Sequence, residues 1–91
     1  MKIYEWDNGK NIKLKEERGL SFEEVLFYLE RNEVMDVVPH PNRTKYPNQR
    51  IFVLNIDNYV YLVPFVEEND VVFLKTIIPS RKATKQYHGR E

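Results

Sequence analysis

The sequence contains no cysteine and only two histidines. Without cysteine the chain forms no disulfide and offers no thiolate to a metal or to a nucleophilic site. The histidines, His40 and His88, lie 48 positions apart without an HxxxH or CxxC pair, so we expect no metal site and no cofactor. The nucleotide-binding patterns GxGxxG and GxxxxGK are also absent, and nothing supports a Ser/His/Asp arrangement.

Long apolar runs are missing as well. No run approaches the roughly 20 residues that cross a bilayer, and residues 1–7 lack the apolar stretch of a signal peptide. We therefore expect a cytoplasmic protein without a membrane segment. The 91 residues, of which 42% are hydrophobic, suffice for one packed domain, which we place at residues 1–91.

An excess of either charge is absent, because fourteen basic residues balance fourteen acidic ones. The charges are nevertheless unevenly distributed. Residues 37–56 carry three basic side chains and no acidic one, and residues 71–91 carry five basic and one acidic, whereas residues 1–36 and 57–70 are acidic. The two basic segments could converge on one surface that attracts an anion, or the segregation could be accidental.

Two helices are predicted near the N-terminus. Asp7 can cap a helix over residues 8–18, and Gly19 suits its end because glycine adopts the left-handed conformation without a Cβ clash. Residues 21–24 read Ser-Phe-Glu-Glu, a capping box in which the serine hydroxyl accepts a hydrogen bond from the second glutamate's amide. Apolar residues at helical spacing predict a second helix over residues 22–32 (Phe22, Val25, Leu26 and Leu29).

Short β-type segments alternate with turn residues through the rest of the chain. We predict five strands, over residues 2–6, 34–38, 50–56, 59–66 and 71–79. Pro64 predicts a bulge or an interrupted edge, because proline donates no ladder hydrogen bond. Residues 39–49 hold three prolines and form a loop, and residues 80–87 start a short basic helix. The order β-α-α-β-β-β-β-(α) predicts an α+β domain with two helices packed on one face of an antiparallel sheet.

The turns predict which strand residues share a face. A two-residue turn at 57–58 places residue 54 opposite 61, and a four-residue turn at 67–70 places 66 opposite 71. We call one side the aromatic face: Arg50, Phe52, Leu54, Tyr59, Tyr61, Phe65, Leu74, Thr76 and Ile78. We call the other the aliphatic face and expect it to pack on the helices: Ile51, Val53, Val60, Leu62, Phe73, Lys75 and Ile77. The aromatic face would then be free to stack nucleic-acid bases while Arg50 holds a phosphate. The alternatives are that Tyr59 and Tyr61 form a structural cross-strand pair, or that this face is a partner interface.

Cationic residues stand at strand ends, where functional side chains gather on small scaffolds. Arg50 opens a strand, and Arg81 and Lys82 follow the last one. Arginine binds phosphate through two aligned donors and keeps its charge. His40, between two prolines, has the chemistry of an acid or base near neutral pH. Each has a structural alternative: a salt bridge for Arg50, a capping or solvated position for Arg81, and a surface turn for His40.

Motifs at both ends of the chain resemble those of the BrnT toxin family. Residues 4–7 (Tyr-Glu-Trp-Asp), Lys10-Asn11 and residues 18–24 (Arg-Gly-Leu-Ser-Phe-Glu-Glu) are similar to that family's F-x-W-D, K-N and R-G-h-S-F-E-E segments, where h is hydrophobic. Residues 77–84 (Ile-Ile-Pro-Ser-Arg-Lys-Ala-Thr) are similar to its closing I-I-S-A-R-K-A-T. The resemblance extends over nearly the whole chain.

The resemblance implies a RelE-like ribonuclease fold and the toxin of a type II toxin–antitoxin system. Such a toxin would cleave RNA without a metal ion and inhibit translation. Its partner would be a DNA-binding antitoxin, usually of ribbon-helix-helix type, and both a homodimer and a toxin–antitoxin heterotetramer are open as assemblies.

The same resemblance indicates site residues. Arg81 matches the arginine of the closing motif, Arg50 matches an arginine that opens the central strand, and Lys45 lies in a loop where the family often has a basic residue. With His40 these are the candidate catalytic residues, which would stabilise charge on phosphorus and transfer protons. The candidate RNA contacts are Lys82, Lys85 and Tyr61.

The chain departs from the family in two places. The family often has a basic residue five positions before the closing arginine, where this chain has Thr76. Lys75 is adjacent but is predicted to point to the other face unless a bulge at Pro64 shifts it. Pro79-Ser80 replaces Ser-Ala in the closing motif. A non-catalytic RNA- or protein-binding module that keeps the toxin fold is therefore the alternative to a ribonuclease.

Overall fold

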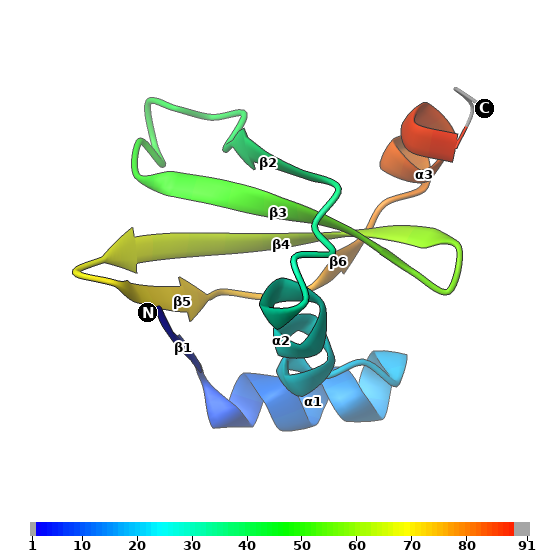
Figure 1. Ribbon diagram of the computed structural model, residues 1–91, viewed down its shortest axis with the longest axis horizontal. Helices are drawn as coiled ribbons and strands as arrows, with labels where there is room; N and C mark the ends of the chain where they lie inside the picture. Colours follow the sequence, from blue (N-terminus) through cyan, green and yellow to red (C-terminus); the bar gives the residue numbers. More distant parts are fainter. Residues whose placement is uncertain (1, 89–91) are drawn as a thin grey trace.

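The chain begins with a strand and two helices and continues as a meander of strands that ends in a third helix (Figure 1). The computed structural model describes residues 2–88. Its elements are β1 (Ile3–Trp6), α1 (Asn8–Arg18), α2 (Phe22–Glu30), β2 (Asp36–Pro39), β3 (Gln49–Ile56), β4 (Tyr59–Glu68), β5 (Val71–Leu74), β6 (Ile78–Pro79) and α3 (Arg81–His88). The predicted α+β class is confirmed. Within residues 2–88 no helix is long and apolar enough to cross a membrane.

Five strands lie in the order β1-β5-β4-β3-β2, and β6 also pairs with β4. The pairs among β2–β6 are antiparallel as predicted, but β1 lies parallel to β5. The sheet is therefore mixed rather than antiparallel. Because the two helices carry the chain across the sheet, β1 and β2 are consecutive strands in the sequence but form its opposite edges (Figure 1).

Capping side chains set the ends of α1 and α2. The Asp7 carboxylate accepts hydrogen bonds from two amides of the first turn of α1, at 2.8 and 3.4 Å. α1 is followed by Gly19, whose φ of 66° is the left-handed conformation that glycine adopts freely. Ser21 Oγ accepts from the Glu24 amide at 3.2 Å, as the capping box predicts. α2 ends at Glu30, earlier than predicted.

The two hairpins of the meander differ in how well their turns were predicted. The β3–β4 hairpin has the predicted register, with Leu54 opposite Tyr61. The β4–β5 turn contains only Asn69-Asp70, both with positive φ, so Val71 pairs with Glu68 rather than with residue 66. Because this change moves the pairing by an even number of residues, side chains up to the end of β5 keep their predicted faces.

α1 and α2 pack on the aromatic face of the sheet, not on the aliphatic face as predicted. Phe52 and Phe65 of this face stack with their ring centroids 3.9 Å apart. They belong to the same core as Phe22 and Val25 of α2 and Leu14 of α1. α1 buries only one apolar side chain, so the rings of the sheet supply the volume that fills the space beneath the helices.

A break between β5 and β6 divides the predicted strand 71–79 at the level of Pro64. Pro64 accepts a hydrogen bond from the Lys75 amide at 2.8 Å but has no N–H to return, so the ladder stops there, as predicted. Arg18 stabilises the break from the helix side, because its Nη1 donates to the Ile77 carbonyl at 2.7 Å.

Between Leu74 and Ile78 the chain has one more residue than the segment of β4 that it faces. Side chains after the break therefore lie on the opposite face of the sheet from the one that an unbroken strand would give them. Leu74 pairs with Phe65, but Ile78 pairs with Leu62 instead of its neighbour at position 61. Ile77 is consequently buried in the core beneath the helices, and Ile78 lies exposed on the aliphatic face. The prediction had these two isoleucines the other way round, because it assumed an unbroken strand.

Candidate functional site

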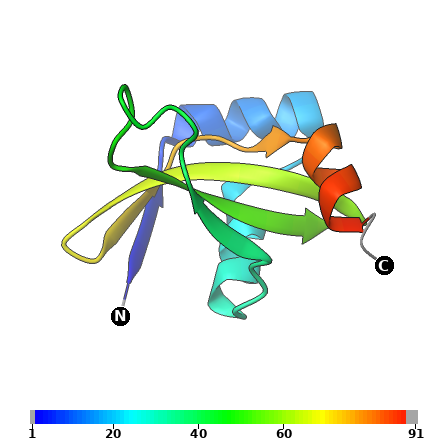
Figure 2. The ribbon, with the colours of Figure 1, turned by 90° about the horizontal axis from the view of Figure 1, so that it is seen from above.

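The two predicted catalytic arginines lie at opposite ends of the sheet. Arg50, near the start of β3, pairs with Phe65. Arg81 begins α3 shortly after Pro79, which pairs with Tyr61. The two β4 partners are separated by about 13 Å of strand, and α3 lies at the other end of the sheet from the β4–β5 turn (Figure 1, Figure 2). The structure therefore does not bring Arg50 and Arg81 into one site.

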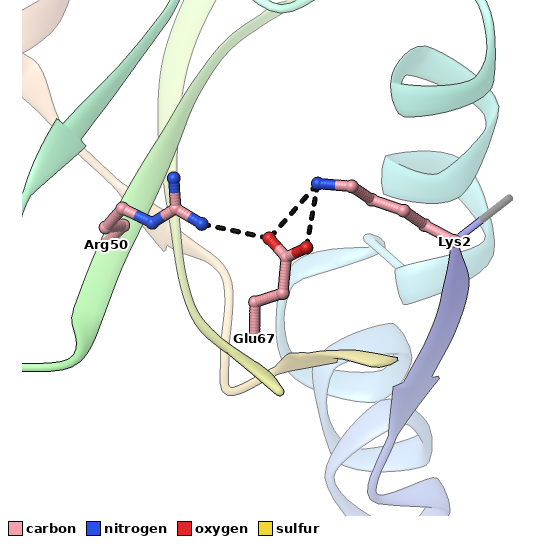
Figure 3. Close-up of polar contacts among 3 residues, drawn as sticks. All are labelled: Lys2, Arg50 and Glu67. Carbon is pink, nitrogen blue, oxygen red and sulfur yellow. Dashed lines mark hydrogen bonds and ion pairs between the residues drawn. The ribbon is translucent and has the colours of Figure 1, made fainter. Parts of the chain in front are cut away.

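Arg50 is held in an ion cluster with Glu67 and Lys2 (Figure 3). Its Nη2 lies 2.9 Å from Glu67 Oε1, and Lys2 Nζ lies 2.9 Å from Glu67 Oε2. The hydrogen bond from Lys2, and after it the charges of Lys2 and Arg50, hold the pKa of Glu67 below its ordinary value. The Arg50 guanidinium also lies 5.0 Å from the ring centroid of Phe65. This geometry is the salt bridge that was the structural alternative for Arg50.

The surface hollow beside Arg50 carries acidic as well as basic groups. Its volume is about 710 Å³, and its lining is Pro47, Asn48, Arg50, Val66, Glu67 and Glu68. Because two carboxylates accompany one guanidinium, the charge of this hollow does not favour a phosphate group.

The loop between β2 and β3 is held by hydrogen bonds of its own. His40 Nδ1 accepts from the Asn42 amide at 3.0 Å, so the neutral imidazole carries its proton on Nε2. Asn42 Oδ1 in turn accepts from the Lys45 amide at 3.1 Å. The His40 ring packs on Tyr46 at 4.6 Å, and Lys45 Nζ lies 5.3 Å from the centroid of the same ring. The loop therefore presents His40 and Lys45 from one small unit.

α3 is fixed to the aliphatic face of the sheet by its small residues. Ala83 is buried against Val53 and Val60. Thr84 Oγ1 accepts from the Val60 amide at 2.9 Å and donates to the Ser80 carbonyl at 2.7 Å. Ser80 Oγ also caps the helix by accepting from the Ala83 amide at 3.1 Å. Sequence reasoning did not assign a role to Thr84, and its place in the closing motif was the signal that could have found it.

The three cations of α3 contribute to none of these anchoring contacts. Arg81, Lys82 and Lys85 are exposed. Among the residues that the structure describes, none of their side chains has an ion-pair or hydrogen-bond partner. Their charge is therefore available to a ligand, in contrast to that of Arg50.

A groove of about 390 Å³ lies between α3 and the start of the proline-containing loop. Its lining is Val38, Pro39, Pro41, Ile51, Val53, Leu62, Ser80, Lys82, Ala83, Gln86 and Tyr87. The aliphatic floor comes from the sheet face that α1 and α2 leave uncovered, and Lys82 contributes charge to its wall. An apolar groove with an adjacent cation suits a ligand that has both a flat apolar part and a negative group.

Tyr61 and Lys75 lie on opposite sides of the sheet. Tyr61 is half-buried against the core beneath the helices, and its ring centroid lies 5.6 Å from that of Tyr59. It does not line the groove, and its contacts are those of the structural pair that was its alternative. Lys75 is exposed on the aliphatic face, with Nζ 5.5 Å from the ring centroid of Phe73. The nearby Thr76 is half-buried.

No protein-family model, no curated protein and no solved structure matches this chain. Within residues 2–88 no three His, Cys, Asp or Glu side chains lie together as metal ligands would.

Proposed function

We propose that this chain is the toxin of a type II toxin–antitoxin system, of the BrnT type and with a RelE-like fold, and that it cleaves RNA. The motifs at both ends of the chain support the family, and the observed α+β order is compatible with it. The observation that carries the proposal is the groove beside α3, where an apolar floor adjoins cations whose charge is unpaired within residues 2–88. A base would enter the groove while Arg81, Lys82 and Lys85 hold the flanking phosphates.

The proposed cleavage uses the RNA's own 2′-hydroxyl. Its proton passes to water and its oxygen forms a bond to the neighbouring phosphorus. The bond from phosphorus to the 5′-oxygen breaks and that oxygen takes up a proton, which leaves a 2′,3′-cyclic phosphate and a 5′-hydroxyl. Arg81 would stabilise the negative charge that develops on the phosphate oxygens. His40, whose Nδ1 accepts from the Asn42 amide, would donate a hydrogen bond from Nε2–H to a phosphate oxygen, and water would supply the proton for the departing 5′-oxygen. Arg50 has a structural role in this proposal, because Glu67 already binds it.

The test is growth after induced expression without an antitoxin. We expect the wild type to stop growth and Arg81→Ala to relieve the arrest. Lys13→Ala is the matched control, because Lys13 is an exposed cation on α1, away from the groove. Full toxicity of Arg81→Ala, at wild-type protein levels, would count against the proposal. Arg50→Ala is expected to stay toxic if its fold survives, which would distinguish a structural from a catalytic arginine.

A non-catalytic RNA- or protein-binding module is the second candidate. It is favoured by Thr76, which replaces a basic residue frequent in the family, and by the pairing of Arg50 with Glu67. Purified protein incubated with RNA in the presence of EDTA separates the two. Fragments ending in 2′,3′-cyclic phosphate support cleavage, whereas bound RNA that stays intact over hours supports the binding module.

A further inference from the structure

The outer edge of β2 is blocked against pairing with another strand. His40 donates its N–H to the Gln49 carbonyl at 3.0 Å, so the alternation of the strand makes Val37 and Pro39 the residues whose backbone points away from β3. The Val37 N–H is bound by the Asp36 carboxylate at 2.8 Å, and Pro39 has no N–H. Both outward donors are therefore lost, which is a common protection of edge strands.

The outer edge of β1 lacks this protection. Ile3 donates its N–H to the Asp70 carbonyl at 2.9 Å, so Tyr4 and Trp6 direct their backbone N–H and C=O groups away from β5. Within residues 2–88 β1 pairs with β5 alone. The sheet therefore has one blocked edge and one edge that can accept a further strand.

The side chains of β1 indicate what kind of strand would fit. On the helix side, Tyr4 and Trp6 are half-buried and pack against the main core, so they offer partly exposed rings to a neighbouring strand. On the aliphatic face Ile3 is 57% exposed and Glu5 is also exposed. A strand beside β1 would therefore meet aromatic surface on one side and a carboxylate on the other.

The surface next to β1 on the aliphatic face is apolar with an acidic rim. A hollow of about 320 Å³ is lined by Val66, Glu68, Asn69, Val71 and Phe73. It adjoins β1 because Val71 and Phe73 pair with Ile3 and Glu5. Glu68 lines it, and Glu5 and Asp70 are exposed carboxylates on neighbouring residues; of the cations within residues 2–6 and 65–75, Lys2 is paired with Glu67 and Lys75 lies over Phe73. This balance favours a basic ligand.

We infer that the free edge of β1 binds an extended segment of a partner protein in which apolar and basic residues alternate. The segment pairs its backbone with Tyr4 and Trp6, lays its apolar residues against their rings, and directs its basic residues toward Glu5 on the aliphatic face. A second copy of this chain fits less well, because two such copies would bring their acidic rims together. The inference stands independently of RNA cleavage.

A synthetic peptide tests the inference. The probe is fluorescein-labelled (Lys-Val)₄, with (Glu-Val)₄ as the charge control, measured by fluorescence anisotropy. We expect binding of the lysine peptide only, and binding about tenfold weaker to Glu5→Lys but unchanged to Glu30→Lys, an exposed carboxylate at the end of α2. Two further peptides carry N-methyl groups on alternate amides, one on the amides that would face β1 and the other on those that would face away. The first peptide should bind about tenfold or more weakly, and the second should bind as the unmodified peptide does.

Amide hydrogen exchange measured by NMR locates the binding. The amides of Tyr4 and Trp6 should gain protection when the lysine peptide binds, whereas that of Val37 should not change. Binding that is insensitive to both N-methylated sets, or that leaves Tyr4 unprotected, would overturn the inference. Sedimentation measures whether the protein alone forms a dimer. A dimer in which the Tyr4 amide is already protected from exchange would also overturn the inference, because a second copy of the chain would then occupy this edge. Loss of RNA cleavage would not affect any of these results.

Discussion

A buried asparagine joins the two N-terminal helices and allows a quantitative prediction. Asn11 on α1 is 1% exposed. Its Oδ1 accepts from the Phe22 amide at 2.7 Å, and its Nδ2 donates to Glu23 Oε1 at 2.8 Å. The Phe22 amide is one of the first in α2, which have no partner inside the helix. Replacing Asn11 with alanine would leave this buried N–H without an acceptor.

The expected loss of stability follows from these two hydrogen bonds. A buried donor left unsatisfied costs about 1–3 kcal/mol. The bond to Glu23 adds little, because that side chain is 55% exposed and screened by water. We therefore expect Asn11→Ala to lower the free energy of unfolding by about 1–3 kcal/mol, out of a total of roughly 5–14 kcal/mol for a chain of this length. The midpoint of thermal unfolding should fall by roughly 4–24 °C.

Urea denaturation followed by circular dichroism measures this loss, and two further variants separate its causes. Asn11→Leu keeps most of the side-chain volume but no acceptor, so it should remain destabilised if the hydrogen bond matters more than the cavity. Asn11→Asp keeps the acceptor for Phe22 but places a second carboxylate beside Glu23, so Glu23→Gln should rescue it. A loss below about 1 kcal/mol for Asn11→Ala would refute the assigned role, because it would mean that the Phe22 amide finds another partner.

Three further changes test other parts of the fold. Thr84→Val should lower the free energy of unfolding by about 1–3 kcal/mol and speed hydrogen exchange at the Val60 amide, because that amide loses its acceptor. Because the pKa of Glu67 is lowered in the folded protein, its ionised carboxylate stabilises the fold above the ordinary carboxyl pKa of 4.5, and this stabilisation is lost as pH falls through the folded-state pKa. The free energy of unfolding, measured by urea denaturation, should therefore change less between pH 7 and pH 3 for Glu67→Gln than for the wild type. Gly19→Ala should cost about 1–2 kcal/mol by the same assay, and because nothing lies within 4 Å of the added Cβ, the cost comes from the backbone conformation alone.

Features fixed by neighbouring residues were predictable from the sequence. Asp7 and the capping box determine where α1 and α2 begin, because each cap contacts amides within a few residues. The Asp57-Asn58 turn determines the β3–β4 register for the same reason. Pro64 predicted the break between β5 and β6, since a missing N–H is a property of the residue itself.

Features that depend on distant segments were not predictable in this way. The pairing of β1 with β5 joins the first strand to one near the other end of the chain. The choice of the aromatic face for the helices depends on how Phe52 and Phe65 fill the volume beneath α2, which no pattern along one strand reveals. The separation of Arg50 from Arg81 was not predictable for the same reason, because it depends on where along β4 their strands pair, at Phe65 for Arg50 and at Tyr61 for the segment before Arg81.

The break opposite Pro64 implies that the number of residues between β5 and β6, and not the charge of α3, determines on which face of the sheet α3 lies. An uninterrupted strand would turn Ile78 toward α1 and α2. The Arg-Lys-Ala-Thr motif would then follow the sheet on the aromatic face, which these two helices already cover. Deleting one residue from the segment 75–77 would therefore disable the groove without altering any residue that lines it. In any related chain, the number of residues between β5 and the closing motif is thus as informative about the site as the arginine itself.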